Sequence, residues 1–308
     1  MTASTTPTAA AAPATTADTP AARDQGDGQE AGRRRSPWWR YLLLGIGAIV
    51  FLFPFYYMLI GSFSGRTDAG PRGLIPGAGG FSLVNYREIN AAIDLGRSLL
   101  NSLVFTAGVL LCTLVFGSLA GYALARLRFR GRGVLFAAML LLQTVPFQLL
   151  VIPIYVLVAR DYGLADNPIG IIAPFAINST AVFVFRQYFL QLPNELFEAA
   201  RIDGASELRV MWSVALPMVR PALLTGALLT FIGPWNEFLW PFLITKKQSL
   251  QPLAVSLSNY ITTAAATATN YFGATLAGAC VLAAPAVVLF VLFQRKFVAT
   301  DIGSGVKG

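Results

Sequence analysis

The sequence predicts an all-α integral membrane protein whose helices cross the bilayer six times. Of its 308 residues, 55% are hydrophobic and only 12% are charged, which is unlike an ordinary soluble domain. A helix rises about 1.5 Å per residue, so about 20 apolar residues cross a hydrocarbon core of roughly 30 Å. Six segments come close to this length: 41–63, 98–125, 134–158, 168–185, 221–244 and 271–293.

The first 37 residues differ from the rest in composition. Residues 1–37 contain no Leu, Ile, Val or aromatic residue and are rich in Ala, Thr, Pro and Gly, so we expect a disordered tail. The apolar run behind it continues without a charge from Tyr41 to Gly65 and has no Ala-x-Ala cleavage site after it. This favours a retained spanning helix over a signal peptide.

The residue content of the chain excludes several kinds of chemistry. There is no histidine, and Cys112 and Cys280 both lie in long apolar runs, where we expect them to be packed. This excludes a histidine metal site, a disulfide framework and imidazole-based catalysis. The net charge of +8 is spread over short basic clusters between apolar runs, which fits membrane topology better than nucleic-acid binding.

Basic residues also indicate the orientation in the membrane, because cytoplasmic loops carry an excess of Lys and Arg. An even number of spans places both termini on one side. The termini and the loops after the second and fourth spans hold most of the basic residues, so we expect them to be cytoplasmic. The strongest signal follows the second span directly and consists of Arg126, Arg128, Arg130 and Arg132.

The chain is predicted to have four parts. A disordered cytoplasmic tail covers 1–37, and a first spanning helix with an extracytoplasmic loop covers 38–96. A spanning core covers 97–295, and a cytoplasmic tail covers 296–308. Within the core, the segment 192–221 is too polar to span the membrane and too apolar for a plain linker. We call it the 192–221 loop.

The 192–221 loop is predicted to form two short helices. Pro193 suits a first helical turn and Asn194 suits its cap, after which Leu196, Ala199 and Ala200 share a face. Asp203 and Gly204 end this helix, because glycine tolerates a left-handed backbone. Ser206 would cap the second helix, which Pro217 and Pro221 stop, and one apolar stripe on it would contain Leu208, Met211, Trp212, Ala215 and Leu216.

Periodicity alone leaves open whether this hairpin rests on lipid or docks on a partner. Its sequence, EAARIDGASELRVMWSVALP, resembles the EAA motif of binding-protein-dependent ABC importers, with Met211 and Trp212 near the usual aromatic of the second helix. The resemblance implies that the loop docks into a groove of a separate ATPase, with Glu198 and Gly204 at the contact. The implied coupling residues are Glu198, Ala199, Ala200, Asp203, Gly204, Ala205, Met211, Leu216 and Pro217.

Other segments resemble maltose-type carbohydrate permeases over about residues 97–308. They are NSLVFTAGVLLCTLVFGSLAGYALARLRFRGR, TVPFQLLVIPIY, PWNEFLWP and FVATDIGSGVKG. The resemblance implies the type I ABC importer permease fold, in a bacterial cell membrane, with a second homologous permease, two ATPase subunits and an extracytoplasmic sugar-binding protein as partners. It also implies that a terminal tail contacts the ATPases through Gly303, Gly305, Lys307 and Gly308.

The expected cargo is a carbohydrate, and the alternatives are a sugar derivative such as a glycerol phosphate ester or amino sugar, a peptide, or a passive channel or receptor. No G-x-x-x-x-G-K-[ST] sequence occurs, so we expect no hydrolysis by this chain, no cofactor in it, and ATP with Mg bound by the partner ATPase. A membrane enzyme would have to pair Glu237 with Asp203, which we expect on opposite sides of the bilayer.

Glu237 is the one ionisable side chain within a predicted span, where a charge costs about 2.5 to 3.5 kcal/mol. Pro234 and Pro241 flank it and predict a kink or break. Glu237 and Asn236 would either satisfy freed backbone groups or meet sugar hydroxyls. Uncharged hydrogen-bonding residues in spans three and four are further candidates for the substrate path, or for bonds between helices: Gln143, Asn178, Ser179 and Thr180.

Overall fold

The computed structural model describes residues 38–65, 70, 73, 75, 80–264 and 270–302, with the side chains of 264 and 295–302 excepted. Most of these described residues are helical. Among them, the only pairing between extended segments is an isolated bridge between Ser64 and Phe81. The all-α prediction is therefore confirmed. The predicted tail at 1–37 and the tail residues from 303 onward lie outside the described residues.

The chain divides into two compact units, residues 1–49 and 50–308. Helix α1 (Trp38–Phe63) begins in the first unit and ends in the second. The helices of the second unit are α2 (Val84–Ile93), α3 (Leu95–Cys112), α4 (Ser118–Arg126), α5 (Arg132–Gln143), α6 (Phe147–Tyr155), α7 (Pro168–Ile172), α8 (Ser179–Gln191), α9 (Asn194–Ile202), α10 (Glu207–Val210), α11 (Leu216–Met218), α12 (Arg220–Asn236), α13 (Leu239–Ile244), α14 (Leu253–Ala264) and α15 (Tyr271–Ile302). Shorter turns join some of them: π-helical η2 (Thr113–Gly117), η3 (Val156–Asp161) and η5 (Met211–Ala215), and 3₁₀-helical η4 (Ala173–Phe175) and η6 (Gln248–Leu250).

Three helical segments of the described chain are long and apolar enough to cross a membrane by themselves: Trp38–Phe63, Leu95–Arg126 and Tyr271–Gln294. Three pairs of helices pass the same test together but are bent at a short break, and counting each pair as one span gives six. The pairs are Arg132–Gln143 with Phe147–Asp161, bent by 99°, Pro168–Phe175 with Ser179–Gln191, bent by 52°, and Glu207–Met218 with Arg220–Asn236, bent by 80°.

The packing of α4, α8 and α12 centres on Phe185 of α8. Its side chain is fully buried and lies against Gly117 and Gly121 of η2 and α4 and against Gly226 of α12. A Cβ atom at Gly226 would approach the phenyl ring to 2.5 Å, and one at Gly121 would approach Cβ of Phe185 to 2.8 Å. Glycine is required at these two positions because the helices meet too closely for a side chain.

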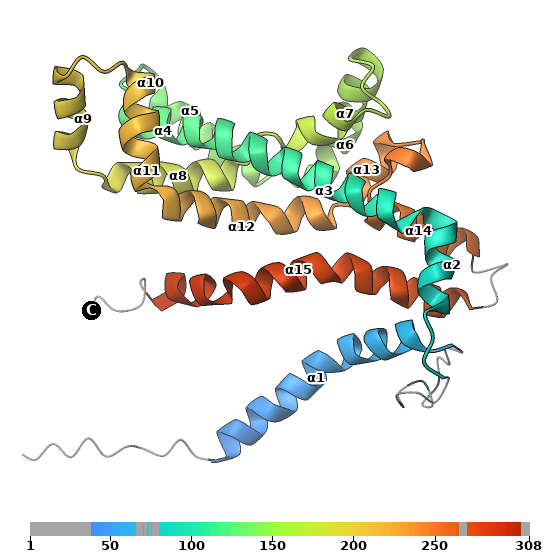
Figure 1. Ribbon diagram of the computed structural model, residues 1–308. Helices are drawn as coiled ribbons and strands as arrows, with labels where there is room; N and C mark the ends of the chain where they lie inside the picture. Colours follow the sequence, from blue (N-terminus) through green and yellow to red (C-terminus); the bar gives the residue numbers. More distant parts are fainter. Residues whose placement is uncertain are drawn as a thin grey trace, which may run out of the picture. The chain divides into compact units, whose positions relative to one another are not determined.

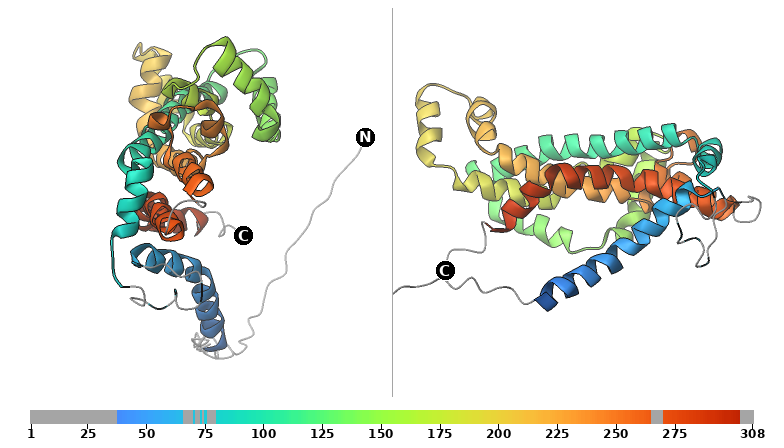
Figure 2. Two further views of the ribbon diagram at one scale, coloured as in Figure 1. Left: turned by 90° about the vertical axis from the view of Figure 1, so that its right-hand side faces the viewer. Right: turned by 60° about the horizontal axis from the view of Figure 1, so that its bottom comes forward.

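Within the second unit, the 192–221 loop and the segment 80–96 lie at opposite ends of the long helices. Helices α9 and α10 stand beside the end of α4 and the end of α8, whereas α2 and α14 cover the other end (Figure 1). The turned view gives the same arrangement (Figure 2). The second unit therefore has a distinct end at which the 192–221 loop is presented.

Candidate functional site

The 192–221 loop folds as the two helices that its sequence predicts, with a sharp turn between them. Helix α9 ends at Ile202, and Gly204 follows with φ +78°, a left-handed conformation that favours glycine. The Ser206 hydroxyl accepts a hydrogen bond from the Arg209 backbone N–H at 3.4 Å, which caps α10. The predicted turn and the predicted second cap are therefore confirmed.

Two details of the first helix differ from the prediction. Asn194 does not cap α9: its Oδ1 accepts from Nη1 of Arg126 at 2.5 Å instead, because its side chain turns toward the end of α4. The buried residue of α9 is Phe197, whereas Leu196 and Ala199 are exposed and Ala200 is only partly buried. The helix packs through one large aromatic side chain.

The predicted apolar stripe on the second helix is wrong in two of its five residues. Leu208 and Trp212 are 60% and 47% exposed, while Val210, Met211 and Ala215 are buried. Together with the partly buried Val214, these buried residues form a stripe of ordinary helical spacing on a face rotated from the predicted one, although Met211–Ala215 is a π-helical turn. The helix also continues through Pro217, and the chain bends at Val219 instead, between α11 and α12.

The residues implied in coupling divide into an exposed set and a packed set. Met211 is 1% exposed in a core that includes Phe185, Phe189 and Phe197, so its side chain supports the loop from inside. Ala200, Ala205 and Leu216 are partly buried. The exposed members, which lie on α9, at its turn and near the end of the second helix, are Glu198, Ala199, Asp203, Gly204 and Pro217.

Arg126, at the end of α4, joins three segments. Its Nε donates to the Phe189 carbonyl at 2.8 Å, its Nη2 donates to the carbonyls of Phe189 and Leu192, and its Nη1 donates to Asn194. The last carbonyls of a helix lack partners within the helix, so one guanidinium closes the end of α8. The guanidinium carbon also lies 4.3 Å from the ring centroid of Phe197, a cation–π contact.

Glu207, at the start of α10, makes a second link. Its Oε2 accepts from the hydroxyl of Tyr122 on α4 at 3.0 Å, and its Oε1 accepts from Nε of Arg201 on α9 at 2.7 Å. The Arg201 hydrogen bond lowers the pKa of the Glu207 carboxyl, and the same hydrogen bond raises the pKa of Arg201. Both helices of the loop are thus held to the end of α4.

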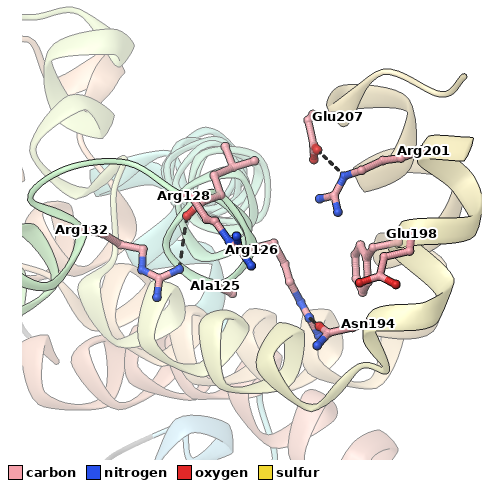
Figure 3. A pocket seen from close by; sticks show the side chains of 10 residues that line it. Ala125, Arg126, Arg128, Arg132, Asn194, Glu198, Arg201 and Glu207 are labelled. Carbon is pink, nitrogen blue, oxygen red and sulfur yellow. Dashed lines mark hydrogen bonds and ion pairs between the residues drawn. The ribbon is translucent and has the colours of Figure 1, made fainter.

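A polar groove of about 620 Å³ lies between α9 and the chain that leaves α4. Figure 3 shows Arg126 reaching Asn194 on one side of the groove and Glu207 paired with Arg201 on the other. The groove is lined by Ala125, Arg126, Leu127, Arg128, Arg132, Asn194, Phe197, Glu198, Arg201 and Glu207.

The residues predicted for a substrate path do not form one cluster of contacts. Gln143 at the end of α5 donates from Nε2 to Oγ1 of Thr180 on α8 at 2.5 Å. Asn178 caps α8 by accepting from the Ala181 backbone N–H at 3.0 Å, and Ser179 begins that helix. The break between α5 and α6 thus brings Gln143 next to the start of α8.

Asn236 and Glu237 instead bond the backbone of their own segment. Nδ2 of Asn236 donates to the Ile232 carbonyl at 3.0 Å, and Oε1 of Glu237 accepts from the Trp240 backbone N–H at 3.2 Å. Helix α12 ends at Asn236 and α13 begins at Leu239, so the predicted break is confirmed. These bonds agree with the alternative in which the pair satisfies backbone groups at the break.

The side chains that hold the 192–221 loop could not all be predicted from the sequence. Arg126 was assigned only to membrane topology, and Tyr122, Phe197 and Glu207 received no role. A signal existed for Arg126, because an arginine at the last residue of a span stands where helix ends carry unpaired carbonyls. Cys112 and Cys280 are free thiols and half-buried. Among the described residues, no group of His, Cys, Asp or Glu side chains could hold a metal ion.

An all-helical chain with up to six apolar spans and a polar two-helix loop at one end is a multi-spanning membrane protein. Residues 113–297 match the model of the family described as binding-protein-dependent transport system inner membrane component, and the chain belongs to this family. The predicted fold and the prediction of a permease subunit of a binding-protein-dependent ABC importer are confirmed, whereas the maltose type within this family stays a prediction. Members of this family work in a transporter complex with other subunits.

The chain is similar to named permeases over most of its length. It is 33% identical to the arabinooligosaccharides transport system permease protein AraQ of Halalkalibacterium halodurans, over 90% of this chain and 99% of that protein. It is 31% identical to the sn-glycerol-3-phosphate transport system permease protein UgpE of Yersinia pestis, over 84% of this chain and 93% of that protein.

A solved structure has the same fold. It is the crystal structure of a bacterial ABC transporter involved in the import of the acidic polysaccharide alginate. One of its chains superposes with a TM-score of 0.71 and 28% sequence identity, and the match covers 84% of this chain and 95% of that chain.

Proposed function

We propose that the chain forms half of the translocation pathway of an ATP-driven importer for an oligosaccharide or related carbohydrate. One observation carries this proposal: the exposed turn with Glu198 and Gly204 is fixed to the spanning helices by Arg126 and Glu207. A loop that only rested on lipid would not need such links. Relatives that carry arabinooligosaccharides and alginate support the cargo class.

The proposed complex contains a second homologous permease, two ATPase subunits that bind ATP and Mg, and an extracytoplasmic sugar-binding lipoprotein. This chain hydrolyses nothing and binds no cofactor or nucleic acid. It resides in the bacterial cell membrane with both termini and the 192–221 loop in the cytoplasm. The tail residues Gly303, Gly305, Lys307 and Gly308 contact the ATPases.

The links define a route for force through the chain. When the ATPases close, they displace the turn at Gly204, and Arg126 and Glu207 pass this movement to α4 and α8. Phe185 then carries it to α12, because its Cβ lies against Gly121 of α4 and its ring lies between Gly117 of η2 and Gly226 of α12. Ordered links of this kind let a surface displacement rearrange packed helices.

The resemblance to UgpE supports a glycerol phosphate ester as a second candidate cargo. The candidate path residues favour a neutral sugar, because Gln143, Asn178, Ser179 and Thr180 are uncharged and Glu237 would repel a phosphate. Uptake of labelled arabino-oligosaccharide and of labelled sn-glycerol-3-phosphate, measured in parallel through the intact transporter, distinguishes the two. Transport of the phosphate ester alone would contradict the carbohydrate proposal.

The substitution Gly204→Pro tests the coupling role. Proline fixes φ near −65°, so it cannot adopt the φ of +78° at this position, and the turn between α9 and α10 must change. We expect the subunit to insert in the membrane but ATP-driven uptake to be lost. The matched control is Gly163→Pro, which changes another glycine at positive φ in the loop between α6 and α7. Normal uptake by Gly204→Pro would refute the docking model.

A further inference from the structure

The turn between α4 and α5 forms a hollow in which positive charge is concentrated. Its volume is about 490 Å³, and its lining residues are Arg128, Phe129, Arg130 and Arg132. No carboxylate lines it. Glu198 and Glu207 lie on the larger groove next to it, of which Arg128 and Arg132 also form part. The hollow therefore offers cations without a neutralising partner of its own.

The guanidinium groups in the hollow are available to a ligand. Arg132 donates once, from Nη1 to the Leu127 carbonyl at 3.2 Å, which holds its side chain beside the turn (Figure 3). Arg128 and Arg130 are exposed and have no hydrogen bond or ion pair with any described residue. Arg126 differs from them, because each of its three guanidinium nitrogens already donates to a carbonyl or to Asn194. Free guanidinium forks match the oxygen atoms of a phosphate group.

The backbone at the start of α5 also favours an anion such as phosphate. Helix α5 begins at Arg132, and Gly131 at its N-cap has φ +84° and supplies no side chain to the first N–H groups. The unpaired N–H groups and the helix dipole favour an anion at this end. Arg132, the first residue of α5, also lines the hollow, so the start of the helix adjoins the arginines.

The surroundings indicate that the anion belongs to a lipid. The turn joins the end of one span to the start of the next, which places it at the depth of the headgroups. Among its 12 residues, α5 has none that is buried, and Val134 and Leu135 just beyond the hollow are 74% and 56% exposed. Phe129 is 43% exposed, as expected of an aromatic anchor at the interface.

We propose that this hollow binds the phosphate headgroup of an anionic phospholipid, whose acyl chains lie along the exposed apolar face of α5. Arg128 and Arg130 contact the phosphate oxygens, and Arg132 with the start of α5 closes the site. The bound lipid fixes the turn that directly follows Arg126, the residue that holds the 192–221 loop. Binding of the lipid at this site requires that the chain is inserted in the membrane, and it does not depend on which cargo is transported.

Native mass spectrometry of the intact transporter tests the proposal with three probes: phosphatidylglycerol, phosphatidylcholine and inorganic phosphate. We expect the wild type to retain phosphatidylglycerol in preference to phosphatidylcholine, and Arg128→Gln/Arg130→Gln to bind it about 30-fold more weakly, or about fivefold per arginine. Arg128→Lys/Arg130→Lys should keep most of the affinity. The matched control is Lys246→Gln/Lys247→Gln, which removes two exposed cations from the loop after α13 and should leave binding unchanged.

Other results would overturn the proposal. Equal retention of phosphatidylglycerol by Arg128→Gln/Arg130→Gln and wild type would exclude the site, and equal retention of both lipids would exclude selection of an anion. Binding of inorganic phosphate as tight as that of the lipid would assign the hollow to a free anion. If the variant kept its lipid but lost a partner subunit, the arginines would form a protein interface. A thermal unfolding curve for each variant checks that it is folded.

Discussion

At the scale of single residues, Arg126 has the most connections of the side chains that hold the 192–221 loop. Arg126→Ala would leave the carbonyls of Phe189 and Leu192 without this partner, at about 1 to 3 kcal/mol for each group that stays buried and unpaired. We expect the loop to loosen, so that the transporter hydrolyses more ATP per sugar imported. Uptake and phosphate release measured on the same proteoliposomes give this ratio.

The control for Arg126 is Arg209→Ala. Arg209 is an exposed arginine of α10 whose side chain makes no hydrogen bond or ion pair with a described residue, so its loss should leave the ratio unchanged. Arg126→Lys should recover little, because an ammonium cannot reach three acceptors in the plane of a guanidinium. An unchanged ratio in Arg126→Ala would show that the link carries no force.

Glu207 provides a pH-dependent prediction. The Arg201 hydrogen bond lowers the pKa of Glu207 in the folded protein, so the stabilisation is present above the ordinary carboxyl pKa and is lost as the pH falls through the lowered value. Both side chains are more than 40% exposed, so we expect at most about 1 kcal/mol. Thermal unfolding of Glu207→Gln should show a lower Tm than wild type at pH 7. The two proteins should converge in acid, and a difference that persists there would contradict this origin.

At the scale of elements, the contact between α8 and α12 depends on the absence of a side chain at Gly226. Gly226→Ala puts a methyl group 2.5 Å from the ring of Phe185, and such overpacking costs typically 1 to 3 kcal/mol. Gly233→Ala on the same helix has nothing within 4 Å, so it should be neutral or slightly stabilising. Unfolding of the two purified variants makes the comparison.

A second substitution separates packing from helix propensity at Gly226. Phe185→Leu shortens the side chain that the new methyl group would meet, so the double variant should lose less stability than the two single changes predict together. Additive losses would show that Phe185 and Gly226 do not interact. The glycines would then matter only for the backbone of each helix.

Some elements could be predicted from the sequence because a local rule decides them. The turn at Gly204 follows from one residue that tolerates positive φ, and the break at Glu237 follows from the prolines beside it. The stripe on the second helix was only partly predicted, because Val210 and Val214 face the core that includes Phe185 and Phe197, and local spacing does not show which face meets this core. The bonds from Arg126 to Phe189 and from Tyr122 to Glu207 join residues 63 and 85 positions apart, so only the folded chain brings them together.

At the scale of the whole molecule, the second unit has two ends that should face different compartments. The 192–221 loop occupies one end, and the segment with Ser249 lies at the other, where its carbonyl accepts from Nε of Arg97 at 2.9 Å (Figure 1). The proposed orientation places Glu195 in the cytoplasm and Ser249 outside it.

Cysteine labelling in intact cells tests this orientation. In a chain with both native cysteines replaced by alanine, Ser249→Cys should react with a membrane-impermeant maleimide, since α13 and η6 bring this position to the outer end. Glu195→Cys, in the exposed first turn of α9, should react only after the cells are permeabilised, because the positive-inside rule places the loop beside four arginines in the cytoplasm. Reaction of Glu195→Cys in sealed cells would show that the topology is the inverse of the proposed one. It would also remove the ATPase from the partners that the 192–221 loop can reach, since ATP is hydrolysed on the cytoplasmic side.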